Sequence, residues 1–207
     1  MNFKSHWEKI YGTKKSTQVS WYQRNPAVSL GLIALTGISR TGQIIDVGGG
    51  ASVLVDKLLN QRFENVTVLD ISANAIGHAQ KRLGLQAQKI HWIESDILDC
   101  DLPSSYDVWH DRAVFHFLTS TRDRKKYVEA MIKAVSADGH VIIGTFSLDG
   151  PSRCSGLLVQ PYSPETLQRE IGPSFSLVKS INEIHITPAR TQQKFIYSYF
   201  KKEAKKT

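Results

Sequence analysis

The fold of this chain is decided by one stretch of sequence, Ile44–Ser52, which reads IIDVGGGAS. Its apolar, branched first half is typical of a strand buried on both faces of a sheet. The glycines that follow let the backbone turn tightly and approach a ligand closely. Segment 52–61 then carries leucine and valine at helical spacing, so the turn leads into a helix whose N-terminus presents free N–H groups. Nucleotide-binding sites use such a strand, turn and helix, and so do purely structural loops.

The same alternation of strand and helix continues along the chain. Short apolar runs, rich in branched or aromatic residues, cover 43–47, 66–70, 89–93, 106–110 and 140–145. Helices are expected between them, near 52–61, 72–84 and 121–135. Strands that are apolar on both faces belong in a parallel sheet covered by helices. The alternation therefore predicts an open, doubly wound α/β sheet with right-handed crossovers.

The pattern changes after the fifth run. Ser163 and Pro164 are expected as the N-cap and the first residue of a helix. Two strands follow, at 176–181 and 194–200, with too few residues between them for a crossover helix, so they should pair antiparallel. We therefore expect a sheet of seven strands, mostly parallel with the last strand antiparallel, preceded by a short helical cap.

A single domain accommodates all 207 residues. Within it we expect an N-terminal cap or lid segment over 1–39 and a cofactor-binding core over 40–146. A C-terminal helix and the antiparallel strand pair should occupy 147–207. No internal repeat, low-complexity tract or linker divides the sequence.

The net charge of +7 raises the question of a nucleic-acid partner. The tail 201–207 holds four lysines and one glutamate, and the other basic runs lie far apart, so the sequence argues against nucleic acid. No run approaches the ~20 apolar residues of a membrane span. The first residues lack the apolar core of a signal peptide, and a cytoplasmic location is expected. Cys100 and Cys154, with no histidine cluster beside them, predict neither a metal site nor a disulfide.

Acidic residues follow the second and third predicted strands. Asp70 lies 20 residues beyond Gly50, the interval at which an acid binds the hydroxyls of a ribose. A helix N-cap is the alternative use of this acid, but Ser72 can provide that cap. Asp96 follows the third strand, where an acid can accept a hydrogen bond from an adenine amino group; alone, such a residue more often serves a loop. Together with Gly48, these acids fit one ligand lying across the sheet.

Four motifs in this order resemble those of the class I S-adenosylmethionine-dependent methyltransferases, which have a Rossmann-like fold. They are Asp46-x-Gly48-x-Gly50, VLDIS at 68–72, SDI at 95–97 and YDVWHDRAVFHFL at 106–118. The match runs from about residue 40 to 146, and the late antiparallel strands extend it to nearly the whole chain. The resemblance implies S-adenosylmethionine as the cofactor and methyl transfer to a small molecule or a protein side chain.

The resemblance also implies roles for individual residues around the methionine part of the cofactor. Gly48 and Gly50 would pass under it, and Asp46 would orient that loop or bind the amino group. Asp111, at the end of the fourth strand, stands where the family often contacts the same amino group. The family often has a third glycine where this chain has Ser52, which can instead cap the following helix.

At the adenosine part, the resemblance implies four further contacts. Asp70 would bind the ribose hydroxyls and Asp96 the adenine amino group. Ile71 and Ile97 would sandwich the adenine ring.

Five residues are candidates for the acceptor side. His116 is the candidate catalytic base, a role that matters only for an acceptor that is protonated at working pH; packing or loop support is the alternative. His110 and Arg112 lie nearest the edge where the acceptor should enter, with a buried structural histidine and a surface salt bridge as their alternatives. Trp21 and Tyr22 precede the sheet and either wall the substrate pocket or pack on the sheet edge.

Two other classes of protein share part of these motifs. A nicotinamide-dependent Rossmann oxidoreductase would share the first two, but Ser52 and the late antiparallel pair argue against it. A non-catalytic methyltransferase-like binding module would keep the fold, but the intact cofactor motifs argue against that alternative. The sequence identifies neither the acceptor atom nor the oligomeric state.

Overall fold

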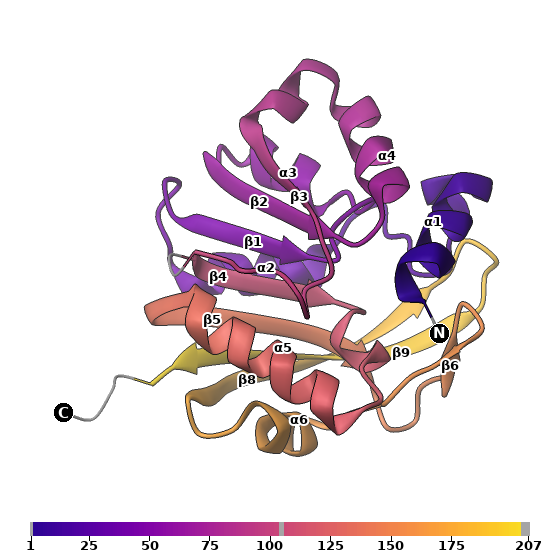
Figure 1. Cartoon of the computed structure of the whole chain (residues 1–207). Coiled ribbons are helices and arrows are strands. Elements are labelled where there is room, and N and C mark those ends of the chain that lie inside the picture. The colour runs from indigo at the N-terminus through magenta and orange to yellow at the C-terminus, as the bar shows by residue number, and fades with distance from the viewer. Residues whose placement is uncertain (1, 104–105, 204–207) are drawn as a thin grey trace.

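The computed structural model describes residues 2–103 and 106–203, which build a seven-stranded sheet with helices on both faces (Figure 1). The strands lie in the order β3-β2-β1-β4-β5-β9-β8. Their bounds are β1 Gln43–Val47, β2 Asn65–Asp70, β3 Ile90–Glu94, β4 Tyr106–Arg112, β5 Val135–Phe146, β8 Phe175–Ile186 and β9 Gln192–Lys202. The strand order reverses between β1 and β4, and in open α/β sheets ligands bind at the carboxyl ends beside such a point.

Strand directions confirm the sheet expected from the sequence. Strands β1 to β5 pair parallel with their neighbours, and β9 pairs antiparallel with both β5 and β8. The connection from β8 to β9 is a tight turn, in which the Thr187 N–H donates to the Thr191 carbonyl at 2.9 Å. Because that turn is so short, the last two strands are forced to run in opposite directions.

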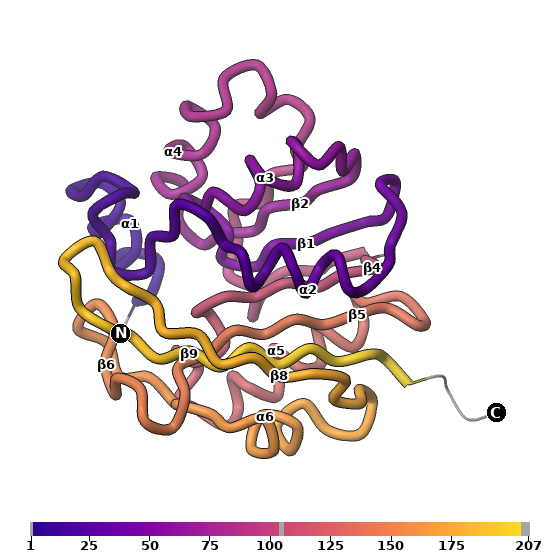
Figure 2. Tube along the Cα trace, turned by 180° about the vertical axis from the view of Figure 1, so that it is seen from behind, coloured from indigo at the N-terminus to yellow at the C-terminus, as the bar shows by residue number. Residues whose placement is uncertain are grey.

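Helices cover both faces of the sheet. They are α1 Phe3–Thr13, η1 Ser16–Gln18, α2 Ala27–Thr36, α3 Leu54–Asn60, α4 Ala73–Leu83, η2 Gly84–Lys89, η3 Phe115–Phe117, α5 Thr121–Ala134 and α6 Pro164–Ile171. Successive residues of β1 alternate between the two faces, so Ile44 packs with α2 and α3 while Ile45 packs with α5 and α6. Figure 2 shows α2 lying across the sheet on the side opposite α5.

Two serines start helices where the sequence predicts it. The Ser72 hydroxyl accepts the Ala75 N–H at 3.1 Å at the start of α4, and the Ser163 hydroxyl accepts the Thr166 N–H at 3.2 Å at the start of α6. These bonds satisfy N–H groups that a helix cannot pair internally. Because Ser72 provides this cap for α4, Asp70 is available for another role.

The carboxyl edge of the parallel strands is covered by α1 and by a small hairpin (Figure 1). The hairpin consists of β6 Arg153–Cys154 and β7 Leu157–Leu158, strands too short to be recognised in the sequence. The fifth strand also begins earlier than predicted, at Val135, because Val135 already pairs with Tyr106. The pairing is irregular between Val135 and His140, where Asp138 has φ 59°.

Among the described residues, no helix is long and apolar enough to span a membrane.

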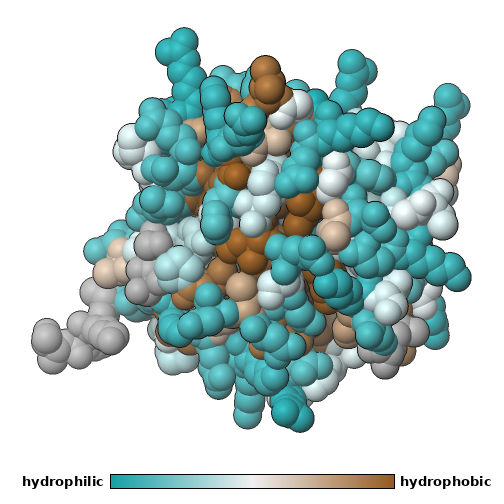
Figure 3. Space-filling view, turned by 45° about the horizontal axis from the view of Figure 1, so that its top comes forward, coloured by the Kyte–Doolittle hydropathy of each residue, from teal (hydrophilic) through white to brown (hydrophobic). Residues whose placement is uncertain are grey.

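The space-filling view shows hydrophobic residues gathered in the middle of one face, with polar side chains around them (Figure 3).

Candidate functional site

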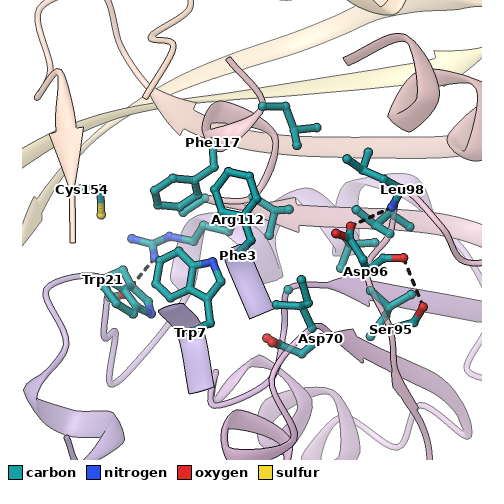
Figure 4. Close-up of a pocket in the computed structure, with 18 of the residues that line it drawn as sticks. Phe3, Trp7, Trp21, Asp70, Ser95, Asp96, Leu98, Arg112, Phe117 and Cys154 are labelled. Atoms are coloured by element: carbon teal, nitrogen blue, oxygen red, sulfur yellow. Dashed lines mark hydrogen bonds between the residues drawn. The ribbon is translucent and has the colours of Figure 1, made fainter. Parts of the chain in front are cut away.

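A cavity lies at the carboxyl ends of the parallel strands, beneath α1 (Figure 4). It encloses about 840 Å³, a volume that includes space open to solvent. Its acidic end consists of Asp70, Ser95 and Asp96, which follow β2 and β3. Its aromatic end consists of Trp7, Trp21, Phe117, Arg112 and Cys154. Figure 4 shows these two groups on opposite sides of the cavity.

Three glycines form the loop between β1 and α3, and a Cβ at each of them would overlap a neighbouring side chain. Gly48 has φ 69°, and a Cβ there would overlap Val114. A Cβ at Gly50 would overlap the Asp70 carboxylate and lie 2.6 Å from the Ala75 Cβ. A Cβ at Gly49 would overlap the carboxylate of Asp46. The sequence prediction included Gly48 and Gly50 and missed Gly49. All three make room for other side chains, and of the three Gly48 lines the larger cavity.

Asp46 and His110 form a buried pair beneath this loop. The His110 Nδ1 lies 2.7 Å from Asp46 Oδ1, and its Nε2 lies 2.9 Å from the Ser29 hydroxyl of α2. Both ring nitrogens are therefore engaged, which favours the structural alternative, although His110 also lines the smaller adjoining cavity described next. The other carboxylate oxygen, Asp46 Oδ2, is buried without a hydrogen-bond partner. It belongs to a smaller adjoining cavity above the glycines, of about 540 Å³, which Tyr22 also lines.

Asp70 is buried at the acidic end of the cavity, where its Oδ1 accepts the Ser72 N–H at 2.8 Å. Burial raises the pKa of Asp70 to about 7, against the lowering effect of this hydrogen bond and one from the Gly50 backbone. Burying a carboxylate costs free energy, and a ligand whose hydroxyl groups donate hydrogen bonds to it would offset that cost.

Asp96 and the two isoleucines lie around the same end. The Asp96 Oδ1 accepts the Leu98 N–H at 3.0 Å, and the Ile71 and Ile97 side chains line the cavity next to it. Ile97 is buried and Ile71 half-buried. The structure thus brings Asp70, Ile71, Asp96 and Ile97 together, as a single ligand across the sheet would require.

Asp111 takes a different position from the one predicted. It does not line either of these cavities; its carboxylate accepts the N–H groups of Val114 and Phe115, at 2.9 and 3.0 Å, and the Tyr127 hydroxyl at 2.5 Å. Burial is the main reason that the pKa of Asp111 rises to about 6. The residue therefore holds the loop after β4 against α5, which fixes the cavity wall from behind.

His116 is fully buried and does not line the cavity. Its Nδ1 accepts the Phe146 N–H at 3.2 Å. Burial, together with the nearby charge of Arg112, lowers the pKa of His116 to about 3. The geometry favours the packing alternative, because a base must reach the proton that it removes.

The aromatic end combines Trp21 and Arg112, which the sequence prediction included, with aromatic residues that it did not include. The Trp7 ring makes edge contacts with the Trp21 and Phe117 rings, at centroid distances of 5.5 and 5.1 Å. The Trp21 Nε1–H donates to the Tyr11 hydroxyl at 3.0 Å. Phe3, Trp7 and Tyr11 all line the cavity. A spacing of four residues places them on one face of a helix, a signal that was present in the sequence.

A glutamate joins α1 to the acidic side of the site. The Glu8 carboxylate accepts the backbone N–H groups of Ala73 and Asn74, at 2.6 and 3.2 Å, at the N-terminus of α4. Lys4 pairs with Glu94 at 2.7 Å on the outer surface. The covering helix is thus attached to the segment that directly follows Asp70.

Comparisons with known proteins agree with this geometry. A methyltransferase domain family model matches residues 45–141. A malonyl-[acyl-carrier protein] O-methyltransferase from Anoxybacillus flavithermus is 29% identical over 164 residues, which is 76% of this chain and 60% of the relative. The chain therefore spans about three fifths of the length of this curated relative.

Solved structures of similar fold cover almost the whole chain. A SAM-dependent methyltransferase from Anabaena variabilis has a TM-score of 0.76 at 16% identity, over 98% of this chain and 96% of that one. The N-methyltransferase NodS from Bradyrhizobium japonicum, in complex with S-adenosylhomocysteine, has a TM-score of 0.72 at 16% identity, over 95% and 98%.

A seven-stranded sheet with an antiparallel last strand, and a glycine loop and acids at its switch point, define a Rossmann-like cofactor-binding domain. The matching domain model and the curated relative make the chain similar to methyltransferases. The solved structures show that it shares the fold of S-adenosylmethionine-dependent methyltransferases.

Proposed function

We propose that this protein transfers a methyl group from S-adenosylmethionine to a small molecule. One observation carries the proposal: Gly48 after β1 and the acids after β2 and β3 line a single cavity. The similarity to methyltransferases, one of them in complex with S-adenosylhomocysteine, supports the choice of cofactor. The cavity is covered by α1, which favours a small acceptor over a side chain of a folded protein.

The residues present fit this cofactor. Gly48 lines the cavity, and Gly50 leaves room for the Asp70 carboxylate beside it. The partnerless Asp46 Oδ2 can accept a hydrogen bond from the methionine ammonium group. Asp70 would accept from the ribose hydroxyls and Asp96 from the adenine amino group. Ile71 and Ile97 would enclose the ring.

The catalytic contribution of the chain is mainly positioning. When bound, the cofactor supplies a methyl group already activated by a sulfonium, so holding the acceptor in line with it provides much of the rate. Trp7, Trp21 and Phe117 exclude water from the aromatic end. The described residues of that end include neither a carboxylate nor a histidine to act as a base. We therefore propose an acceptor that reacts in the protonation state it already has at working pH.

We also propose that the chain acts as one domain in the cytoplasm. In this division 1–39 covers the site, 40–146 binds the cofactor and 147–207 completes the sheet. The proposal of a single domain is supported by the shared cavity, which residues from all three parts line, as Trp7, Asp70 and Cys154 do.

Calorimetry with S-adenosylhomocysteine tests the proposal directly. We expect a dissociation constant on the order of 10 µM or below, and no comparable binding of NAD. Production of S-adenosylhomocysteine from S-adenosylmethionine, with a mixture of small-molecule acceptors, would then report transfer. Failure of both S-adenosyl compounds to bind at millimolar concentration would rule the function out.

A further inference from the structure

We propose that Arg112 binds a carboxylate of the methyl acceptor, an inference that rests on the function proposed above. Arg112 is the last residue of β4 and lines the aromatic end of the cavity. Among the described residues of that end it is the only charged side chain. Figure 4 shows its guanidinium between Trp21 and the rings of Trp7 and Phe117.

The guanidinium is held on three sides by the protein. Its Nε–H donates to the Tyr197 hydroxyl at 2.7 Å, and its Nη1 donates to the Trp21 carbonyl at 2.9 Å. Its central carbon lies 4.4 Å from the centroid of the Phe195 ring. Hydrogen bonds in the plane and a ring against the face fix its orientation before any ligand arrives.

The remaining nitrogen, Nη2, is buried and has no hydrogen-bond partner. The nearest carboxylate oxygen, Glu183 Oε2, lies 3.9 Å away, which is too far for a hydrogen bond. Glu183 is held there because it accepts the Tyr197 O–H at 3.1 Å and a Gln23 amide N–H at 2.9 Å. Arg112 and Glu183 thus form a loose ion pair, and Nη2 of this cavity-lining residue still lacks the hydrogen-bond acceptor that an oxygen ligand would supply.

The surrounding chemistry selects an acid over other acceptors. Trp7, Trp21 and Phe117 offer apolar surface, and burial keeps the Cys154 thiol neutral by raising its pKa to about 11. A cationic acceptor would meet the charge of Arg112 in a poorly solvated site, whereas a carboxylate matches the planar guanidinium. A carboxylate is also ionised at neutral pH and needs no base.

Binding to the full chain saturated with S-adenosylhomocysteine tests this inference. The probes are benzoate, phenylacetate and hexanoate, each paired with its primary amide, and affinities are measured by calorimetry or NMR titration. We expect at least one acid to bind about tenfold more tightly than its amide. Arg112→Gln should abolish this preference. Arg112→Lys should keep part of it, because lysine retains the charge and loses the planar donor pair.

Arg124→Gln is the matched control. The Arg124 side chain is 12% exposed, against 11% for Arg112, and it is bonded to Glu170 and to the Thr119 carbonyl, each at 2.9 Å. It does not line the cavity, so its variant should lose stability and keep the preference for acids. In case Arg112→Gln does not fold, the wild-type Nε–H resonance of Arg112 should shift with the acids and not with the amides.

The outcomes separate this inference from the proposed function. If S-adenosylhomocysteine does not bind, the proposed function fails first. If it binds and no acid is preferred, or the preference survives in Arg112→Gln or is lost in Arg124→Gln, the inference is overturned. Weaker S-adenosylhomocysteine binding in Arg112→Gln, with the preference for acids unchanged, would overturn it too and assign Arg112 to the cofactor.

Discussion

The acidic and aromatic ends of the cavity are constructed differently. At the acidic end, Gly48, Asp70 and Asp96 follow three strands that are direct neighbours in the sheet. At the aromatic end, Trp7, Arg112 and Cys154 come from α1, β4 and the β6–β7 hairpin, which are far apart in sequence. The first end is determined by strand order and loop chemistry, and the second by the packing of separate elements on the sheet. A shared cofactor suits the first construction, and an acceptor that differs between relatives suits the second.

The largest effect is expected from Gly50→Ala, which changes only the acidic end. The added Cβ would overlap the Asp70 carboxylate and crowd Ala75. The affinity for S-adenosylhomocysteine should therefore fall about 100-fold, which corresponds to the free energy that overpacking usually costs. Calorimetry measures the change. Gly77→Ala in α4 is the matched control, because a Cβ there meets nothing within 4 Å and should leave binding intact. Equal affinities of the two variants would show that the glycine loop does not form the cofactor cradle.

Asp70→Asn should weaken S-adenosylhomocysteine binding about 30-fold, because a neutral amide replaces the carboxylate that accepts the ribose hydroxyls. In the wild type, affinity should rise with pH through about 7 as Asp70 ionises, and in the variant it should not. Titrations at pH 6 and pH 8 provide the comparison. A pH dependence that is the same in both proteins would exclude Asp70 as its source.

The same substitution has a consequence for stability. The pKa of Asp70 is raised from 3.8 to about 7 in the folded state, so between these values the native protein holds a proton that the unfolded chain releases. The unfolding free energy of the ligand-free wild type should therefore fall as pH rises through this window, by at most about 1.4 kcal/mol per pH unit from this group. Denaturant unfolding at several pH values should show a shallower fall for Asp70→Asn.

Glu8→Ala should loosen the aromatic end with little change at the acidic end. Losing the bonds to Ala73 and Asn74 removes a helix cap, worth about 1 kcal/mol, and should speed S-adenosylhomocysteine dissociation about fivefold by freeing α1. Stopped-flow fluorescence of the tryptophans can follow it. Lys4→Ala is the control, because the exposed pair with Glu94 contributes little. Similar rates in both variants would mean that Glu8 does not hold α1 closed.

The smallest effect concerns His116, which should show no titration between pH 8 and pH 5. Burial lowers its pKa to about 3, so the imidazole stays neutral in this range. NMR of the histidine side chains over this pH range tests the prediction. A titrating His116 whose pKa matched a step in the turnover profile would restore it as the candidate base.

Short-range patterns were sufficient for most of the fold. The period of the apolar runs predicted the parallel strands, and the short connection near Thr187 required the antiparallel last pair. Gly48, Asp70 and Asp96, which the sequence prediction included and which line the cavity, are residues whose position depends only on where a strand ends. Strand ends can be placed from sequence because hydrophobic period and turn residues change there.

Residues whose role depends on a distant partner were harder to place. Asp111 is engaged by Tyr127 of α5, and His110 by Ser29 of α2, and neither partner can be identified from the strand that carries the acid or the histidine. Asp111 therefore accepts hydrogen bonds from the loop after β4, and His110 bonds to Asp46 and Ser29. The position of these residues in the strand predicted where their backbones lie, but it did not predict which partners their side chains bond.

By itself, the sequence determined the cofactor half of this protein, because glycines and acids at successive strand ends meet wherever a parallel sheet forms. Only the tertiary structure decided the acceptor half. In the structure, Trp7 and Phe117 line the cavity and His116 is buried in the core. The Arg112 Nη2 has no hydrogen-bond partner, because Glu183 Oε2 lies 3.9 Å away. The physical reason is that hydrophobic packing is non-directional, so which distant side chains meet depends on how whole elements dock together.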